Sequence, residues 1–498
     1  MSVSAKDLRL EDRSIKRALG LGSALFLLLG IWWAAAPEEL LAYLIVTVAS
    51  LIPAIAWVRQ GRLGVPILPA VAFLHILYYA IPIVRGREDL ETYSYGDILQ
   101  GAVTVGLYLM AATFAASFLM RGARRGGSQT GNLLSDAQMK TLIYLGLAVG
   151  NFFLIAASAG KLGWMGGFFG LARSIALTSL LVACYFLGVG RGRAELRGSS
   201  WWVALAGLGL AIVVSWSSLY LIGGLMFLLA TAVGYVTTRG RIPWLTVGLA
   251  IVLISILHAG KEAMRNRYWQ QDGGEQTSLV RLPQLAVEWF RSGLESLGTP
   301  TKGRSAIDRA SLMQILLKVQ YLTPAYIDYL RGETYALLPA MLVPRFVDPE
   351  KLKSQAGMDL LNIRYGILSA EGVEKTAVGW GLIAESYANF GLLGVIGIGL
   401  VIGAASGALG QWSARGSAVS VSTLVSVAMM VGLINLEQDF AGLVTSLLQS
   451  IAAIFVFVAV LRLFPKRRRR GQAHIRAAGL AEPRPRDAAG TSELQLRL

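Results

Sequence analysis

GWGLIAESYANFGLLGVIGIGLVIGAA, residues 379–405, combines an uncharged apolar run with a carboxylate directly before it. No charged residue occurs between Gly391 and Ala414, and a helix needs only ~20 apolar residues to cross the ~30 Å hydrocarbon core of a bilayer. We therefore predict a membrane span near residues 388–409. Glu385 lies at its entrance, and we expect this side chain to face a reaction chamber on the outer side of the membrane.

The composition of the chain extends this prediction from one span to many. Of its 498 residues, 54% are hydrophobic and 15% are charged, whereas a soluble domain carries about 25% charged residues. The apolar runs are too long for the short alternating strands of a membrane barrel. The first run, 18–36, is long enough to span and lacks a convincing cleavage site, so no cleavable signal peptide is expected. The predicted fold class is an all-α polytopic membrane protein.

About twelve membrane spans are predicted from the apolar runs. They lie near residues 18–36, 40–58, 65–84, 98–120, 141–159, 171–190, 201–217, 219–236, 242–259, 388–409, 419–435 and 443–462. The seventh and eighth form one apolar run that is broken only by SWSS (215–218). That run is too long for a single crossing, so we expect the chain to turn at SWSS.

The placement of Lys and Arg in the short loops predicts the orientation of the chain. RQGR (59–62) and GRGRAELRG (190–198) fall on one side, whereas APEE (36–39) and NLEQDFAG (435–442) fall on the other and contain no Lys or Arg. Both termini are therefore expected in the cytoplasm. The predicted order is a cytoplasmic N-terminus (1–17), nine spans (18–259), a large periplasmic loop (260–377), three spans (378–464) and a basic, disordered cytoplasmic tail (465–498).

The large external loop is the feature that departs most from a simple bundle of spans. A connection of this length is usually functional or disordered, and this one is not of low complexity. LPQLAVEWFRSGLESL (282–297) has apolar residues at helical spacing and predicts an amphipathic helix, lying on the membrane or against the bundle. RSAIDRASLMQILLKVQYL (304–322) predicts a second helix.

Several classes of function are disfavoured by the residues. The formal net charge is +16, but much of the excess lies in short loops and in the tail RLFPKRRRRGQAHIR, so no nucleic acid partner is expected. The single cysteine, Cys184, excludes a disulfide within the chain and a zinc site built on cysteines. No phosphate loop, HExxH motif or strand-linked GxGxxG occurs. The glycines at 399, 403 and 407 favour close helix packing rather than nucleotide binding.

Cations of the external loop are the first candidate functional residues. They are Lys261, Arg265, Arg309, Arg331, Arg345 and Lys351, with His258 beside the first two. Arginine offers a planar fork for phosphate oxygens and lysine a compact charge, so such a cluster at the membrane surface suits a lipid-linked diphosphate. Contact with solvent or with anionic lipid headgroups is the alternative for the cations, and simple packing is the alternative for His258.

Carboxylates form the second candidate group. Glu385 precedes the predicted tenth span, and Glu437 and Asp439 precede the twelfth. A carboxylate in partly apolar surroundings can act as a base, but Glu385 could equally be an ion-pair partner that orients an arginine. Glu38 and Glu39 could serve a metal-dependent mechanism, but we favour a role as acidic residues at the start of a helix. No DxD motif occurs.

The loop and the segment after it resemble the O-antigen polymerase (Wzy-type) family of oligosaccharide repeat-unit polymerases. The resemblance lies in TPAYIDYLRGETYALLPAMLVPRFVDPEK (323–351), in GWGLIAESYANFGLLGVIGIGLVIG (379–403) and in GKEAMR (260–265). The matching residues are Thr323, Pro324, Gly332, Thr334, Tyr335, Pro344, Arg345, Pro349, Lys351, Glu385, Tyr387, Asn389, Phe390 and Gly391. The chain departs from the family at residues 346–349, where a tryptophan-proline pair is common.

The resemblance implies a GT-C-like membrane glycosyltransferase of the bacterial inner membrane, with its active site on the periplasmic side. Such enzymes transfer a growing glycan from polyprenyl diphosphate to the non-reducing end of the next lipid-linked repeat unit. They use no nucleotide, cofactor or metal. Their partners are polyprenyl-diphosphate-linked oligosaccharides such as those on undecaprenyl diphosphate, membrane lipids and a chain-length regulator.

The residues expected at such a site follow from the matches and from the cations. Arg265 and Arg345 would stabilise the diphosphate, and Glu385 would deprotonate the acceptor hydroxyl or position its neighbours. Residues expected to bind substrate are His258, Lys261, Arg309, Arg331, Tyr335, Lys351, Tyr387 and Asn389. A ligase that transfers the glycan to lipid A core remains the nearest alternative. A flippase is the alternative of another class, although it would favour charges within the spans and repeated halves.

Overall fold

The computed structural model describes residues 20–61, 64–85, 90–121, 136–269, 282–298, 311–343, 345, 347–348 and 350–463. The chain divides into two compact units, Met1–Val456 and Phe457–Leu498. Of the second unit, only residues 457–463 are described, and they form the end of the last helix. Arg309 and the expected disordered tail lie outside the described residues.

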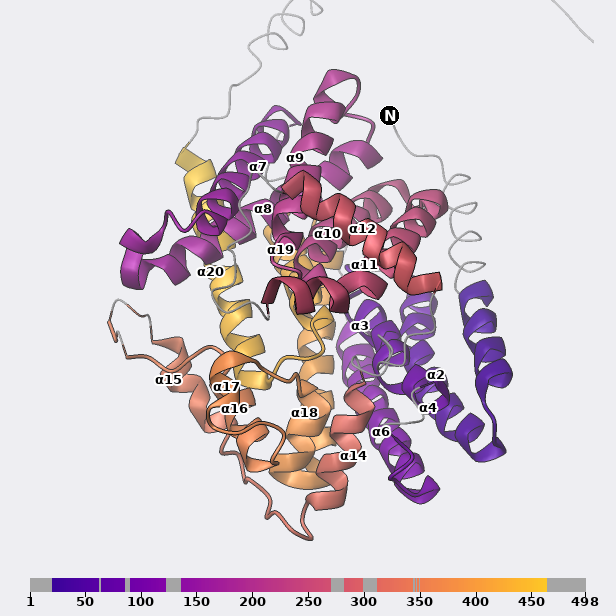
Figure 1. Ribbon diagram of the computed structural model, residues 1–498. Helices are drawn as coiled ribbons and strands as arrows, with labels where there is room; N and C mark the ends of the chain where they lie inside the picture. The colour runs from indigo at the N-terminus through magenta and orange to yellow at the C-terminus, as the bar shows by residue number, and fades with distance from the viewer. Residues whose placement is uncertain are drawn as a thin grey trace, which may run out of the picture. The chain divides into compact units, whose positions relative to one another are not determined.

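The fold is all-helical throughout the part of the chain that the structure describes (Figure 1). Ten helices there are long and apolar enough to cross a membrane, which confirms a polytopic helical protein. They are α2 (Pro37–Arg59), α3–η1–α4 (Ile67–His75, Ile76–Ala80, Ile81–Arg85), α6 (Tyr95–Met120), α7 (Asp136–Ser158), η3–α8 (Gly163–Phe168, Phe169–Gly192), α9 (Ser199–Trp216), α10 (Leu221–Arg239), α11 (Trp244–Trp269), α18 (Gly381–Ala414) and α20 (Phe440–Leu463).

The two other predicted spans are helices that are shorter than expected. Residues 20–33 form a short apolar helix, and α19 (Val421–Ile434) has 14 residues. At 1.5 Å per residue, α19 is only ~21 Å long, less than the ~30 Å of hydrocarbon. The turn predicted at SWSS is confirmed, because α9 ends at Trp216 and α10 begins at Leu221.

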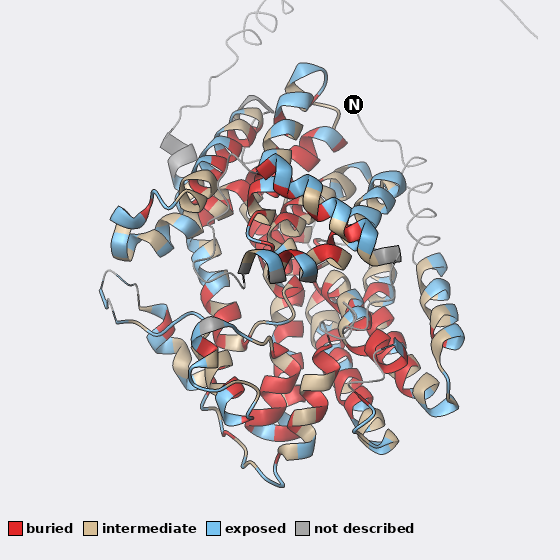
Figure 2. Cartoon of the chain, viewed as in Figure 1, coloured by how far each residue is buried: buried red, intermediate tan, exposed pale blue. Residues whose placement is uncertain are grey.

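Small residues allow α18 to pack closely on α6, and the contact between these two helices is the most extensive one that α18 makes. A Cβ added to Gly403 would lie 2.1 Å from the Ala112 carbonyl oxygen, and one added to Gly407 would lie 2.7 Å from the Ala116 backbone. These glycines therefore let two backbones approach closely, as the spacing of 399, 403 and 407 predicted. Buried residues line the contact between these two helices and also the α3–α4 and α8 helices (Figure 2).

Between α11 and α18, the described residues form six helical elements. They are α12 (Leu282–Gly298), α14 (Leu312–Leu322), η5 (Tyr335–Leu337), α15 (Leu338–Leu342), α16 (Ala356–Arg364) and α17 (Gly372–Lys375). The helix predicted over 282–297 is confirmed as α12. The helix predicted over 304–322 begins at Leu312 among the described residues, and residues 304–310 lie outside them.

Helix α12 packs on α11, which extends well beyond the predicted end of its span at residue 259. A Cβ on Gly293 would lie 2.1 Å from the Ile256 carbonyl oxygen, and the Trp289 indole donates to the Leu257 carbonyl at 2.6 Å. Leu282, Leu285 and Trp289 of α12 are thereby buried against the bundle, whereas Val287, Phe290 and Leu294 are exposed.

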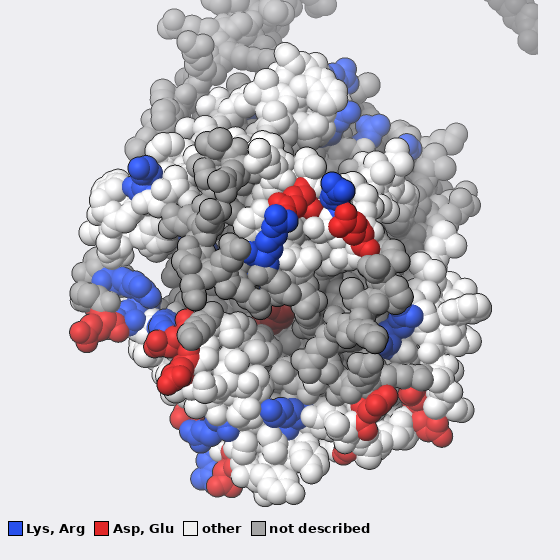
Figure 3. All heavy atoms as spheres, in the orientation of Figure 1, with Lys and Arg blue, Asp and Glu red and all other residues white. Residues whose placement is uncertain are grey.

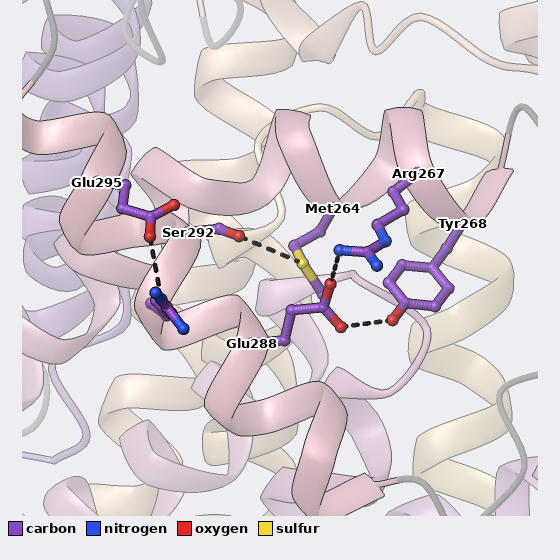
Figure 4. A network of polar contacts seen from close by, with 7 residues as sticks. Met264, Arg267, Tyr268, Glu288, Ser292 and Glu295 are labelled. Carbon is purple, nitrogen blue, oxygen red and sulfur yellow. Dashed lines mark hydrogen bonds and ion pairs between the residues drawn. The ribbon is translucent and has the colours of Figure 1, made fainter.

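Polar contacts connect the outer faces of the same two helices. The Glu288 carboxylate accepts from the Tyr268 hydroxyl at 2.6 Å and pairs with Arg267 (Figure 4). Arg291 and Glu295, one turn apart on α12, pair at 3.1 Å. On this face some Lys and Arg side chains lie next to Asp or Glu, whereas others have no acidic neighbour in view (Figure 3). The α11–α12 pair is therefore held by both an apolar and a charged contact.

Candidate functional site

Helix α18 is interrupted where its apolar part begins. Phe390 (φ −142°, ψ 15°) and Gly391 (φ 62°, ψ −148°) leave helical geometry. The carbonyls of Ala388 and Asn389, at the end of the first segment, accept from the backbone N–H groups of Leu330 and Arg331 at 3.0 and 3.1 Å. Irregular backbone at membrane depth requires such compensation. The result is a short segment, 381–389, that presents Glu385 beside the external loop.

Asn389 is the residue that fastens the external loop to this segment. Its Oδ1 accepts from the Gly332 N–H at 2.9 Å, and its Nδ2 donates to the Thr334 hydroxyl and to the Glu385 carbonyl, both at 2.9 Å. The side chain is fully buried. Sugar binding was predicted for Asn389, but its amide is engaged within the chain, so we interpret it as a positioning residue.

Replacing Gly391 with Ala is expected to destabilise the protein by ~1–3 kcal/mol, because an L-residue is strained at this φ and ψ. The added Cβ would also lie 2.9 Å from the Tyr329 hydroxyl. Thermal unfolding of the purified protein in detergent would measure the loss. Gly397→Ala is the matched control, because no atom lies within 4 Å of its added Cβ. Equal melting temperatures for the two variants would contradict the strained break.

Glu385 is completely buried at the centre of the site. Its Oε2 accepts from the Phe440 backbone N–H at 2.6 Å, at the start of α20. Its Oε1 is buried without a hydrogen-bond partner, although the Thr334 hydroxyl lies nearby. None of the described cations forms an ion pair with Glu385. Both roles considered from the sequence, a base and a partner that positions its neighbours, stay predictions.

Tyr335 lies beside Glu385. Its hydroxyl shares a hydrogen bond with the Ser386 hydroxyl at 2.8 Å, and its ring meets the edge of Phe440 with centroids 5.2 Å apart. Because the Ser386 hydroxyl donates to the Leu382 carbonyl at 2.6 Å, the Tyr335 hydroxyl is the donor to Ser386. Burial, followed by the charge of Glu385, raises the pKa of Tyr335, so this hydroxyl stays protonated. Tyr387 is also buried, but its neighbours are Tyr329 and Gln100.

Asp439 is a second fully buried carboxylate near Glu385. Its backbone carbonyl accepts from the Leu443 N–H at 3.0 Å at the start of α20. Its carboxylate faces the backbone N–H groups of Gly442 and of Asp439 itself, but neither oxygen forms a hydrogen bond of good geometry with them. Burial raises the pKa of Asp439 to about 6; backbone N–H groups of the first turn oppose this, and the charge of Asp359 adds to it. The sequence placed Asp439 before the last span without giving it a role.

Asp359 on α16 was not singled out from the sequence at all. Burial raises its pKa, and the nearby charge of Lys353 lowers it. One carboxylate oxygen, Oδ1, is buried without a hydrogen-bond partner. No motif surrounds Asp359, so only the folding of α16 against the start of α20 reveals it.

Three predicted residues share one face of α11. His258, Lys261 and Arg265 follow one another at spacings of three and four, which places them on the same side of a helix. The Arg265 guanidinium lies 4.9 Å from the centroid of the Tyr220 ring, and its Nη2 donates to the Leu219 carbonyl at 3.2 Å. The guanidinium is therefore held in place by the turn between α9 and α10.

Glu437 connects these cations to the site. Burial raises its pKa, and the charges of Lys261 and Arg265 lower it. Its backbone carbonyl accepts from the Trp380 N–H at 3.1 Å, directly before the segment that contains Glu385. The α11 cations and Glu385 are thus brought to the same end of α18, although more than a hundred residues separate them in sequence.

The remaining predicted cations form a second group. Arg345 is exposed. Burial lowers the pKa of Lys351, the charge of Arg345 lowers it further, and the charge of Asp348 raises it. Arg331 is also exposed and adopts a left-handed conformation (φ 50°), with its backbone N–H bonded to Asn389. The single predicted cluster is therefore resolved into α11 cations near Glu437 and loop cations before α16.

Within the described ranges, no three His, Cys, Asp or Glu side chains are grouped so that they could hold an ion. The Glu39 carboxylate instead accepts from the Ala35 N–H at 3.1 Å, at the start of α2. This contact is the helix-entry role considered from the sequence.

Compared with known proteins, the chain matches no protein-family model, no curated protein and no solved structure. The function must therefore be argued from the residues and their geometry.

Proposed function

We propose that the protein is a polysaccharide polymerase of the O-antigen polymerase type. It transfers a growing glycan from a polyprenyl diphosphate to the non-reducing end of a lipid-linked oligosaccharide repeat unit. The proposal includes a GT-C-like architecture in a bacterial inner membrane, cytoplasmic termini and a periplasmic active site. One observation carries it: the buried, unpartnered Glu385 Oε1 lies at the same end of α18 as the α11 cations.

The proposed reaction assigns a role to each group. Glu385 Oε1 takes the proton of the acceptor hydroxyl, and the hydroxyl oxygen bonds to the anomeric carbon of the donor glycan. The bond from that carbon to the diphosphate oxygen breaks, and its electron pair leaves with the diphosphate. Arg265 and Lys261 stabilise the negative charge on the leaving diphosphate, which is where preorganised charge contributes most to catalysis.

The neighbouring residues support these roles. The Tyr335 hydroxyl donates to Ser386, so its oxygen accepts from a sugar hydroxyl next to Glu385. Asn389 positions the loop that contains Tyr335, through its bonds to Gly332 and Thr334. Arg345 and Lys351, the loop cations, bind the diphosphate of the second lipid-linked substrate. His258 lies one turn before Lys261 on the same helix face and contributes to the same anion site.

A test of this proposal uses the purified protein in nanodiscs with a polyprenyl-diphosphate-linked repeat unit. A ladder of longer lipid-linked glycans on a gel, unchanged by EDTA, is the expected result. Transfer that occurs only after lipid A core is added would replace the polymerase with the ligase alternative. Movement of the intact lipid-linked repeat unit across the bilayer, without extension, would replace it with a flippase.

A further inference from the structure

Three carboxylates lead from the buried centre of the site toward the surface. Glu385 and Asp439 are fully buried, Asp359 on α16 is partly exposed, and Lys353 beyond it is exposed. Each neighbour acts electrostatically on the next: Asp439 on Glu385, Asp359 on Asp439, and Lys353 on Asp359. The order in which these charges act on one another is therefore also the order of increasing exposure.

The backbone holds the first two carboxylates together. Glu385 is bonded through Oε2 to the N–H of Phe440, the residue that follows Asp439. The second link depends on a glycine, because a Cβ on Gly357 would lie 2.1 Å from Asp439 Oδ2. Any other residue at 357 would push the Asp439 carboxylate away, so α16 is built to approach this side chain closely.

Every carboxylate in the series has a buried oxygen without a hydrogen-bond partner. These atoms are Glu385 Oε1, both oxygens of Asp439 and Asp359 Oδ1. Buried polar atoms are almost always paired, and an exception calls for an explanation. An unpaired carboxylate oxygen is free to receive a proton, and four such atoms lie along one route.

We propose that Asp439 and Asp359 form a proton-exit route that carries the proton from Glu385 to solvent beside α16. The direction of transfer rests on the proposed function, in which Glu385 takes a proton from the acceptor hydroxyl. The O–H bond of protonated Glu385 breaks as the proton bonds to the Asp439 carboxylate. The proton then passes to Asp359 and to bulk water or buffer, which restores the Glu385 carboxylate for the next sugar.

The charged and titratable groups around the route fit this role. The middle carboxylate has a pKa of about 6, so it exchanges a proton near neutral pH. Tyr335 faces Glu385 and stays protonated, so it does not compete for the proton. Glu437 is two residues away from Asp439, but its charge is opposed by Lys261 and Arg265. Lys353 favours the ionised form of Asp359 at the outer end.

The kinetic test replaces the outer carboxylate. Asp359→Asn is expected to lower the polymerisation rate about tenfold in dilute buffer, a smaller loss than that of a direct general base. A small diffusible base such as imidazole, at rising concentration, is expected to restore most of that rate, because it takes the proton that Asp359 would have taken. Glu371→Gln, an exposed carboxylate on the same external segment, serves as the control. A loss that imidazole does not reverse would reduce Asp359 to a structural role.

A second measurement needs no substrate and therefore separates the route from the proposed function. Infrared difference spectra over a pH series, with Asp439→Asn used to assign the band, would follow protonation of Asp439. The charge of Asp359 raises the pKa of Asp439, so Asp359→Asn should move this titration to lower pH by ~0.5–1 unit. An unmoved titration would overturn the route even in an active polymerase. A moved titration in a protein that makes no polymer would leave the route standing and the polymerase refuted.

Discussion

Replacing Glu385 with Gln is expected to lower the rate of glycan extension by ~10²–10⁴-fold, the contribution typical of a general base. Glutamine has the same length and keeps an oxygen that can accept from the Phe440 N–H, so the contact between α18 and α20 should survive. What the variant loses is the ability of Oε1 to take a proton. The expected loss is therefore in turnover, with little change in the apparent affinity for the lipid-linked substrate.

The measurement is the initial rate of ladder formation in nanodiscs, together with the melting temperature of each variant. Glu371→Gln makes the same chemical change on an exposed side chain of the external segment and should retain wild-type rates. An active Glu385→Gln protein with an unchanged melting temperature would remove Glu385 from the chemistry. A variant that is inactive and also unstable would instead be compared with Glu385→Asp, which keeps the carboxylate but shortens it.

The spans could be predicted from the sequence because a single physical requirement, burial of ~20 apolar residues in hydrocarbon, acts on each segment alone. The same holds for α12, whose apolar face is visible in the spacing of Leu282, Leu285 and Trp289. The bounds were less certain: α19 is shorter than the run that predicted it, and α11 continues to Trp269 through residues too polar for a span.

The break in α18 could not be predicted, because Phe390 and Gly391 continue an apolar pattern that any helix would accept. It depends on N–H donors from Leu330 and Arg331, some sixty residues earlier in the chain. For the same reason the hydrogen bonds of Asn389 could not be predicted. Its sequence neighbours suggest an exposed polar residue at the membrane surface, whereas its partners lie on the loop at Gly332 and Thr334.

The site was predicted only in part because its groups are assembled by contacts distant in sequence. Glu385 and Tyr335 were expected together from the resemblance, and the structure places them together. The division of the cations into two groups was not expected, since charge counting along a loop does not show which cation a carboxylate such as Glu437 will face. Asp359 had no signal, because a single acidic residue in a polar loop is usually solvated.

Replacing Arg265 with Ala is expected to lower kcat/KM by ~10²–10³-fold, the loss that follows removal of one preorganised group from a developing negative charge. The guanidinium is fixed by the Tyr220 ring and the Leu219 carbonyl, so it needs no rearrangement when the diphosphate leaves. Arg265→Lys should recover only part of the activity, because an ammonium lacks the planar fork and stacks less well on an aromatic ring. Arg291→Ala removes an exposed arginine from neighbouring α12 and should cost little.

A double variant distinguishes a loss of stability from a loss of catalysis as the cause of the lower kcat/KM. Glu437 is exposed, and Arg265→Ala removes one of the two cations that lower its pKa, a change expected to lower the melting temperature only slightly. Arg265→Ala with Glu437→Gln removes both charges, so it should regain the melting temperature without regaining turnover. If the double variant regained turnover as well, Arg265 would serve only to balance Glu437, and stabilisation of the leaving diphosphate would fall to Lys261 and the loop cations.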